Sequence, residues 1–524
     1  MKKIYTLGLF LFCLTLQQTF AQRYVTEVFT DDEITVEKDV IFGVNLSVFA
    51  QIFNPAVDRH IPDTLEADIY MPDLAMDEVQ ERPVIIINAA GNSLPKYVNT
   101  CFGDKEDPFI IDIAQKMAKR GYVVFAFNAR AGINPFAPTN DLFLASLVDD
   151  AVRKAIDYRT AARYLQRDIA EMGNTYGINK DQVIAWGTYV GTYAIAAAYT
   201  TDVAETETPS YFIQDANGEF VNTFNLELAG GLFGEVEGFD ANGNLSNIPN
   251  YPEYVEDYPF DLVVGSRSVV LDTSTIQAGE TPMISFINGN NILGNIETGP
   301  LALPATGEFC CNIFLSQVLQ RQHDALGNVD VWKGVEFTDE IANTRSTYLP
   351  NPALGEIEGL FALSGPSGNQ TPWMWWDTTA CNAVNPDINI DNLENQVGMS
   401  PEMGTAMVDT MIRYWTPRAC VLFGWDCANA VVVGGSTSTK ELAVDPNRIQ
   451  IAPNPSMGNL SFQTVEAYPM ERIRIFNVTG SLIYETAVNN DRHTIDDVGL
   501  SSGIYFAKIL FEDGIATKKI TIER

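Results

Sequence analysis

Short runs of β-branched and aromatic residues alternate with amphipathic segments between Leu65 and Trp425. Runs of this composition form the strands that parallel sheets bury on both faces, and their alternation with helices is typical of α/β folds. The sequence therefore predicts a mainly parallel sheet flanked by helices. The expected buried strands are residues 83–88, 122–128, 182–186, 281–288 and 329–337.

A long amphipathic helix is expected after the second of these strands. Apolar residues recur there at steps of three and four, which places them on one face of a helix. This face consists of Ala151, Ala155, Tyr158, Ala162, Leu165, Ile169 and Met172. The opposite, solvated face is expected to carry the charged residues Arg153, Lys154, Asp157 and Arg167.

The chain is strongly acidic, with 67 acidic and 33 basic side chains and a formal net charge of −34. Its field repels phosphate backbones and anionic lipid headgroups. The charge argues against nucleic acid as a partner, and the 46% hydrophobic content excludes a disordered chain.

Residues 1–21 have the layout of a secretory signal peptide. Lys2 and Lys3 precede an apolar run from Ile4 to Leu16, and a small-residue cleavage site ends at Ala21. The run is shorter than the roughly 20 residues that span a bilayer, and no later charge-free apolar run reaches that length. We therefore expect export and no transmembrane segment in the mature chain.

An exported chain reaches an oxidising compartment, where disulfides form. Of the seven cysteines, Cys13 would leave with the signal peptide. Cys420 and Cys427 are close enough in sequence to predict a local loop, and the adjacent Cys310 and Cys311 are expected to bond to different partners. The spacings match no zinc site. The remaining cysteines are Cys101 and Cys381.

Beyond residue 427 the composition changes. Residues 428–447 include a stretch of small residues, Ala430 to Thr439, that predicts a linker. Short alternating apolar runs with turn residues between them predict a small β-sandwich over residues 448–524. Its expected strands are residues 448–451, 460–464, 472–477, 482–486, 503–510 and 516–522.

This C-terminal segment resembles the type A sorting domain of proteins exported by the type IX secretion system of Gram-negative bacteria. The resemblance rests on residues 453–455, 472–484, 500–505 and 518–520. It implies that outer-membrane secretion machinery reads the domain as an address and that the protein is released or displayed at the cell surface. The domain carries no chemistry in that family, so His493 is not expected in a site.

The strand expected at residues 182–186 runs directly into a tight turn and a helix-forming segment. Strand, Gly-x-x-x-Gly turn and helix form the context of a nucleophile elbow, where glycines are needed because flanking side chains would collide with the neighbouring strand and helix. The glycines are Gly187 and Gly191, and the central position is Tyr189.

Around this elbow the chain resembles the α/β-hydrolase family, most closely the secreted carboxylesterase and acetyl-esterase branch. The resemblance implies an α/β-hydrolase fold over residues 65–427, with N-terminal strands in residues 22–64 and an insertion around residues 201–280. It also implies hydrolysis of carboxylic esters. The clearest segments are residues 65–72, 82–91, 119–132 and 155–191.

The catalytic positions depart from that family. Its nucleophilic serine corresponds to Tyr189, and a phenol, with an ordinary pKa of about 10, is a poor acyl-transfer nucleophile. Its oxyanion motif, His-Gly-Gly-Gly, has become Asn-Ala-Ala-Gly, and the added methyl groups crowd the approach to an oxyanion. The positions concerned are Asn88, Ala89, Ala90, Gly91 and, for a remaining backbone amide, Val190.

The acid and the histidine are also missing from their expected places. After the seventh strand, Asn291 and its neighbours are amides, which do not stabilise an imidazolium as a carboxylate does. The histidine should follow the eighth strand, yet residues 338–340 contain none. His323 is expected on the solvated face of a helix at 312–326, and His60 is a loop residue.

Two other clusters are candidates for binding. Asp387, Asn389, Asp391 and Glu394 gather oxygen ligands of the kind that calcium takes, with an ordinary Asx-rich loop as the alternative. The three tryptophans within residues 373–376 are expected in the core, with a ligand-stacking platform as the alternative. No other cofactor is predicted.

The joint loss of several catalytic positions predicts a secreted or surface-displayed pseudoenzyme that binds an extracellular small molecule, ester or glycan. An esterase with unconventional catalytic residues and a purely structural surface protein are the alternatives. An open pocket beside Tyr189 would favour ligand binding, and a filled one would favour the structural role.

Overall fold

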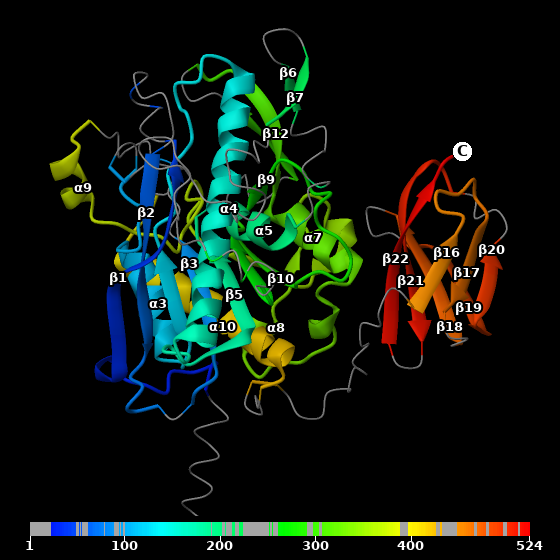
Figure 1. Cartoon of the computed structure of the whole chain (residues 1–524), viewed down its shortest axis with the longest axis horizontal. Coiled ribbons are helices and arrows are strands. Elements are labelled where there is room, and N and C mark those ends of the chain that lie inside the picture. Colours follow the sequence, from blue (N-terminus) through cyan, green and yellow to red (C-terminus); the bar gives the residue numbers. More distant parts are fainter. Residues whose placement is uncertain are drawn as a thin grey trace, which may run out of the picture.

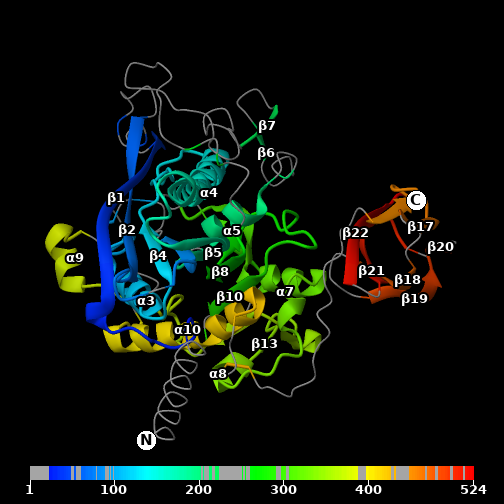
Figure 2. The same cartoon turned by 60° about the horizontal axis from the view of Figure 1, so that its bottom comes forward.

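The structure of the chain is a computed structural model. The predicted signal peptide, and the predicted linker except residues 430 and 431, lie outside the residues that the structure describes. Figures 1 and 2 show a large α/β domain and a small β domain. The described residues are 23–48, 61–77, 79–88, 100–189, 191–201, 260–290, 297–302, 306–387, 397–425, 430–431, 448–465, 469–477, 482–495, 500–511 and 514–524, and within the gaps 52, 54, 94, 96–97, 205, 212–214, 219–223, 251 and 254.

The large domain is built on an eight-stranded sheet with the order β1-β2-β4-β3-β5-β8-β10-β15. β2 pairs antiparallel with β1 and β4, and every pair from β4 across to β15 is parallel. The predicted mainly parallel sheet is therefore confirmed. Its strands are β1 (Ile34–Ser47), β2 (Ile61–Pro72), β3 (Arg82–Asn88), β4 (Val123–Phe127), β5 (Ile178–Gly187), β8 (Leu262–Ser266), β10 (Met283–Asn288) and β15 (Leu360–Leu363).

The expected strands at residues 83–88, 122–128, 182–186 and 281–288 are β3, β4, β5 and β10. The strand expected at residues 329–337 is wrong. Val329 and Trp332 are fully buried, and Trp332 belongs to a 3-10 helix, η6 (Asp330–Trp332). Gly334, with a φ of +76°, ends any extended run. The eighth strand is instead β15. β8 lies inside the range 201–280, where the sequence predicts an insertion.

Helices cover both faces of the sheet because alternate residues of a strand point to opposite sides. Ile85 and Ile87 of β3 pack with α3 and α10, whereas Val84 and Ile86 pack with α4, α5 and α7. Figure 2 shows α3 and α10 on one side of the sheet and α4 on the other. The helices are α3 (Pro108–Ala118), α4 (Asn140–Glu171), α5 (Thr192–Tyr199), α7 (Ser316–Leu326), α8 (Glu340–Asn343), α9 (Thr378–Val384) and α10 (Pro401–Phe423).

Helix α4 is the predicted long helix, but its expected solvated face is largely buried. Lys154 lies 2.6 Å from Asp150, and Arg130 lies 2.8 Å from Asp157. Charged side chains can be buried when such partners satisfy them, so periodicity alone does not mark this face as exposed. Met172, expected on the apolar face, is 63% exposed. The buried charged residues of α4 are Asp150, Arg153, Lys154, Asp157, Arg159, Arg163 and Asp168.

A smaller antiparallel sheet, with the order β11-β12-β9, contacts α4 through β12. Two short hairpins, β6–β7 and β13–β14, are also described. The remaining elements are η1 (Asp31–Glu33), β6 (Phe212–Gln214), β7 (Phe220–Asn222), β9 (Val269–Val270), β11 (Thr298–Ala302), β12 (Phe309–Leu315), β13 (Ser346–Thr347), η7 (Pro352–Leu354) and β14 (Glu356–Ile357).

The C-terminal domain consists of two antiparallel sheets, β16-β17-β20 and β19-β18-β21-β22, around a shared apolar core. This arrangement confirms the predicted small β-sandwich. The short strand β20, which carries His493, is the one that the sequence pattern did not predict. The strands are β16 (Ile449–Ala452), β17 (Leu460–Thr464), β18 (Met470–Asn477), β19 (Leu482–Asn490), β20 (Arg492–Ile495), β21 (Gly503–Phe511) and β22 (Gly514–Ile522).

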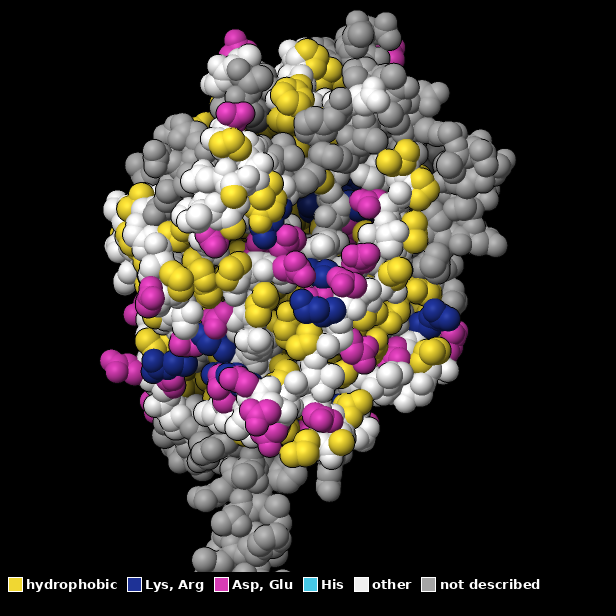
Figure 3. All heavy atoms as spheres, turned by 90° about the vertical axis from the view of Figure 1, so that its left-hand side faces the viewer, with side chains coloured by type: hydrophobic (Ala, Val, Ile, Leu, Met, Phe, Trp, Pro, Cys, Tyr) yellow, Lys and Arg dark blue, Asp and Glu magenta, His cyan; other side chains and the backbone are white. Residues whose placement is uncertain are grey.

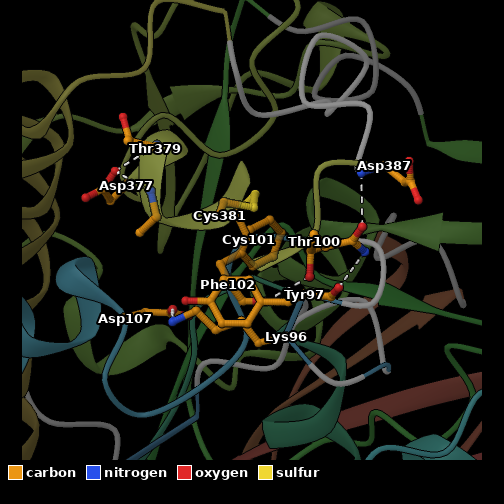
Figure 4. The surroundings of a disulfide bond; sticks show 12 residues. Lys96, Tyr97, Thr100, Cys101, Phe102, Asp107, Asp377, Thr379, Cys381 and Asp387 are labelled. Carbon is orange, nitrogen blue, oxygen red and sulfur yellow. Dashed lines mark hydrogen bonds and ion pairs between the residues drawn. A yellow bond between two sulfur atoms is a disulfide. The ribbon is translucent and has the colours of Figure 1, made fainter. Parts of the chain in front are cut away.

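A disulfide joins Cys101 to Cys381, two residues that are 280 positions apart in sequence. Figure 4 shows this bond, which ties α9 to the segment before α3, with Phe102 next to it. Cys420 is also disulfide-bonded, and its predicted partner Cys427 lies outside the described residues. Cys310 and Cys311 are both free, which corrects their predicted pairing. Among the described cysteines, all the others are already bonded.

The surface of the large domain carries charges of both signs. On the face shown in Figure 3, Asp and Glu side chains are scattered among hydrophobic ones, and Lys and Arg side chains are interspersed with them. Within the part of the chain that the structure describes, no helix is long and apolar enough to cross a membrane.

Candidate functional site

The elbow predicted between β5 and α5 is present, with Tyr189 in its turn. A methyl group on Gly187 would lie 2.6 Å from the Cα of Gly191, and one on Gly191 would lie 2.9 Å from the Cα of Gly265 in β8. Both approaches are too close for a side chain, so the two glycines allow the sharp turn between strand and helix. Val190, the next position of the turn, lies outside the described residues.

The ring of Tyr189 contacts an aromatic ring and a cation. Its side is packed by Phe102 at 4.9 Å between ring centres, and the guanidinium carbon of Arg267 lies 5.0 Å from the ring centre. Phe102 in turn stacks on Trp376 at 5.1 Å. Tyr189 is 7% exposed, so its ring forms a wall of the site and is not a mobile surface group.

Two hydrogen bonds fix the turn at Thr188, the residue before Tyr189. The indole N–H of Trp373 donates to the Thr188 carbonyl at 2.7 Å, and the Thr188 hydroxyl donates to the Asn88 carbonyl at 2.9 Å. The tryptophans Trp373, Trp375 and Trp376 are all buried, as the core interpretation predicts. Trp373 therefore braces the elbow directly, and the three tryptophans do not form an exposed platform.

Asn88, at the oxyanion position, ends β3 and is 2% exposed. Its side-chain amide donates to the Phe127 carbonyl at 3.1 Å, a bond that ties β3 to the end of β4. Ala89, Ala90 and Gly91 lie outside the described residues. At the described part of the oxyanion position, the Asn88 side chain therefore makes a structural hydrogen bond between two strands.

The acid position after β10 is occupied by amides that fasten a neighbouring loop. Asn288 donates to the Pro366 carbonyl at 2.9 Å and to the Asn369 carbonyl, and Asn290 donates to the Gly365 carbonyl at 2.8 Å. A carboxylate has no N–H to donate, so it could not make these bonds. Asn291 lies outside the described residues.

The loop that these amides fasten, residues 364–371, follows β15 and is where a histidine after the eighth strand would lie. Its sequence contains no histidine. The sequence predicts this position at residues 338–340 because it takes residues 329–337 as the eighth strand, which is instead β15.

His323 lies on α7, but it is fully buried, which corrects its predicted solvated position. Its ring centre lies 4.8 Å from that of Tyr199, and its Nδ1 lies 3.2 Å from the Asn328 side-chain nitrogen. Burial lowers the pKa of His323 to about 3, so the ring is neutral inside the core. No signal of this burial was present in the sequence, because the polar residues beside His323 suggested a solvated face. Gln320 and Gln317 on α7 are nevertheless buried as well. His60 lies outside the described residues.

A cavity of about 300 Å³ lies beside Tyr189, between α4, α5, β9 and the small sheet β11-β12. Its wall is mostly aliphatic, with contributions from Val148, Val152, Ile195 and Leu271. The pocket beside the elbow is therefore open and not filled by bulky side chains.

The charged groups of the cavity wall come from α4 and from the segments that follow β8 and β9. On α4, the carboxylate of Asp150 lies 2.6 Å from Lys154 and accepts the hydroxyl of Tyr193 at 3.1 Å. Burial lowers the pKa of Lys154, and the neighbouring Asp150 opposes that shift. Arg267 follows β8, and Asp272 lies beyond β9.

Sequence reasoning missed Arg267. The signal that could have revealed it is the apolar run Leu262–Ser266, which forms a strand whose carboxyl end faces the site. Ligands in open α/β sheets bind at that edge of the sheet. The run is short and contains a glycine, which weakens it as a strand signal. Asp150 and Tyr193 were missed for another reason, because helix periodicity alone does not show which charged face is covered.

Of the four calcium candidates, Asp387 lies within the described residues. Asp387 is exposed beyond the end of α9, and Asn389, Asp391 and Glu394 lie outside the described residues. Across the described ranges, no group of three or more His, Cys, Asp and Glu side chains could hold a metal ion.

Residues 450–523 match the family described as the secretion system C-terminal sorting domain. The C-terminal β-sandwich is thus the sorting domain that the sequence predicts. It indicates interaction with the type IX secretion machinery and export to the cell surface or the extracellular space. No curated protein matches the chain.

Among solved structures, the chain is similar to esterase 2 of Thermogutta terrifontis, with 15% identity and a TM-score of 0.26 over 50% of this chain and 73% of the esterase. It is also similar to an immunoglobulin-like β-sandwich protein of the DUF3244 family from Bacteroides vulgatus, with 20% identity and a TM-score of 0.14 over 16% of this chain and 90% of that chain. PorZ, a surface component of the type IX secretion system of Porphyromonas gingivalis, is similar with 14% identity and a TM-score of 0.14 over 19% of this chain and 14% of that chain.

At these TM-scores the fold assignment rests on the strand order and the parallel pairing of the chain itself. The chain joins an α/β-hydrolase fold to a type IX sorting domain.

Proposed function

We propose that this chain is a secreted or surface-displayed binding protein, in which the pocket of an α/β-hydrolase fold takes a small extracellular ligand without Ser-His-Asp catalysis. The observation that carries the proposal is the cavity of about 300 Å³ beside Tyr189. Small-molecule sites have volumes of about 300–1,000 Å³ and mostly apolar walls with a few polar groups. A pocket beside Tyr189 filled by bulky side chains would have favoured a purely structural surface protein.

The groups around Tyr189 support binding over hydrolysis. A general base must lie within hydrogen-bond reach of the nucleophile. Among the described wall residues of the cavity there is no histidine, and His323 is buried against Tyr199 on α7. The amides of Asn288 and Asn290 donate to loop carbonyls, and this use differs from the orienting of an imidazolium.

Hydrolysis is tested with p-nitrophenyl acetate and butyrate, using the purified chain, its Tyr189→Phe and Tyr189→Ser variants, and an active carboxylesterase as the positive control. We expect no turnover above background in any form of the chain. Tyr189→Ser supplies the aliphatic hydroxyl of a serine nucleophile but no base, so we expect this variant to stay inactive as well. Turnover that disappears in Tyr189→Phe would overturn the proposal and favour the esterase with unconventional catalytic residues.

Binding is tested with the neutral apolar dye Nile red, whose fluorescence rises in an apolar site. Ala151 lines the cavity on α4, so Ala151→Phe fills part of it and should weaken dye binding. Ala170→Phe is the matched control, because Ala170 is exposed on the same helix and does not line the cavity. Equal dye signals in all three proteins would remove the support for a ligand site and favour the structural role.

A further inference from the structure

Two adjacent cysteines on β12, Cys310 and Cys311, carry free thiols. Among the described cysteines, Cys101 and Cys381 bond to each other, and Cys420 is already bonded as well. The sorting domain indicates export, so the mature chain meets an oxidising compartment in which disulfides form. Two free thiols in such a protein need an explanation, and within the described part of the chain each thiol has the other as its partner.

A β-bulge brings the two thiols together. In a regular strand, successive side chains point to opposite faces. In the pairing of β12 with β11, Leu301 is opposite Cys311. The next pair is Ala302 with Phe309, so Cys310 is an extra residue between the two pairs. A bulge of this kind bends its strand and changes the direction of a side chain. The thiols of Cys310 and Cys311 form a hydrogen bond with each other, so their sulfur atoms lie in contact.

The pair lies at the wall of the cavity of about 300 Å³. Cys310 belongs to an apolar cluster with three residues that line this cavity, Ile133, Leu147 and Leu301. The Cys310 thiol also donates to the carbonyl of Asn140, at the start of α4, at 3.5 Å. A covalent change at this pair therefore takes place where β12 and α4 form the cavity wall.

We propose that Cys310 and Cys311 are a modification site, at which a disulfide closes between the two adjacent residues after export. The oxidant is a disulfide of the compartment, carried by a protein or by glutathione. A thiolate of the pair attacks this disulfide, forms a mixed disulfide and releases one thiolate of the oxidant. The neighbouring thiolate then displaces the second sulfur of the oxidant. Two S–H bonds are lost and one S–S bond forms, and the two protons and two electrons leave with the oxidant as two thiols.

Adjacency makes this disulfide quick to close from the mixed disulfide and easy to reduce. The closing step is fast because the attacking sulfur is already held beside the bond that it breaks. The Cα atoms of consecutive residues are about 3.8 Å apart across a trans peptide, less than the roughly 4.4–6.8 Å of an ordinary disulfide. The bond is therefore strained and reversible. Burial raises the pKa of the Cys311 thiol to about 12, so few thiolates are present at neutral pH and the first step is slow.

The first test maps the thiols of the full chain and needs no variant. The purified protein is reduced, freed of reductant and incubated for hours with glutathione disulfide, and it is then unfolded, treated with N-ethylmaleimide and digested with trypsin. The tryptic peptide Ser268–Arg321 contains Cys310 and Cys311 and no other cysteine. We expect this peptide to carry neither maleimide nor glutathione and to be lighter than the reduced peptide by two hydrogen atoms. Two maleimides, a retained glutathione or a bond to a second copy of the chain would overturn the proposal.

The second test asks whether closure needs both thiols. Cys310→Ser and Cys311→Ser each keep one thiol, so after the same treatment the peptide should carry one glutathione or one maleimide. Asn312→Ser is the matched control, because Asn312 is an exposed neighbour on β12 and this variant keeps both thiols. It should close the disulfide as the wild type does. Loss of the free thiol in either single variant without a bound label would contradict a bond between Cys310 and Cys311.

The third test measures how easily the bond opens. The oxidised protein is incubated with rising concentrations of reduced glutathione and mapped in the same way. We expect two maleimides to return to Cys310 and Cys311 while Cys101 and Cys381 are still bonded to each other. Opening only together with or after the Cys101–Cys381 bond would overturn the assignment of a strained, reversible disulfide. All three tests are independent of the proposed function, because they read the state of the thiols whether or not the cavity binds a ligand.

Discussion

Acidification is expected to destabilise the large domain through one buried histidine. Burial lowers the pKa of His323 to about 3, against about 6.5 for a histidine in the unfolded chain. Between these values the unfolded state binds a proton that the folded state excludes. Stability is therefore complete above about pH 6.5 and falls as the pH falls towards the folded pKa. At about pH 4.5 the loss is about 3 kcal/mol, since each pH unit below the unfolded pKa contributes about 1.4 kcal/mol.

Urea unfolding followed by tryptophan fluorescence measures this loss, because all seven tryptophans lie in the large domain. His323→Phe removes the titrating group and keeps the ring that packs on Tyr199. The Nε2 of His323 has no hydrogen-bond partner among the described residues, and Asn328 keeps its bond to the Gln277 carbonyl at 2.7 Å. The phenyl ring removes the acceptor Nδ1 from one N–H of Asn328, a cost that does not depend on pH and that cancels when the losses between two pH values are compared.

The difference between wild type and variant isolates the histidine from the carboxylates that also titrate in this range. Between about pH 7 and about pH 4.5, the wild type should lose about 3 kcal/mol more than His323→Phe. Parallel losses in the two proteins would refute the reasoning, because they would show that His323 is protonated in the folded state or titrates equally in both states.

Three further predictions concern groups that shape the site. Replacing Cys101 and Cys381 by serine should lower the free energy of unfolding by about 2–5 kcal/mol, and urea unfolding of the variant and of oxidised wild type without reductant measures this difference. Gly191→Ala should lower stability by about 1–3 kcal/mol in thermal melts, because the new methyl group would lie 2.9 Å from the Cα of Gly265; an unchanged melting temperature would contradict the steric account. Asn288→Asp should lower the free energy of unfolding by about 3 kcal/mol at neutral pH, because the new buried carboxylate would face carbonyl oxygens. The loss should shrink when acid protonates the new carboxylate.

Most of the fold could be predicted from the sequence because its strands are continuous apolar runs. β3, β4, β5 and β10 are buried on both faces, so their composition alone marks them. The strand predicted at residues 329–337 was wrong because a buried residue such as Trp332 gives the same apolar signal in the sequence whether it lies in a strand or in a helical turn. β8 was missed because five residues with a glycine give a weak signal.

The site was predictable only at the elbow. Gly187 and Gly191 are required locally by the turn that joins a strand to a helix, so spacing reveals them. Arg267 comes from a different strand and meets Tyr189 through a tertiary contact that no local pattern records. His323 was placed on the wrong surface because its polar neighbours on α7 are buried too.

The sequence by itself determined the class of fold, the C-terminal sorting domain and the place of Tyr189 in the elbow, because each follows from local composition or spacing. Only the tertiary structure decided that the charged face of α4 is buried, that the amides after β10 fasten the loop after β15, and that a cavity is open beside Tyr189. Those outcomes depend on which segments pack against each other. Packing of segments distant in sequence sets burial, ion pairing and empty volume, and these three properties decide what the site can bind.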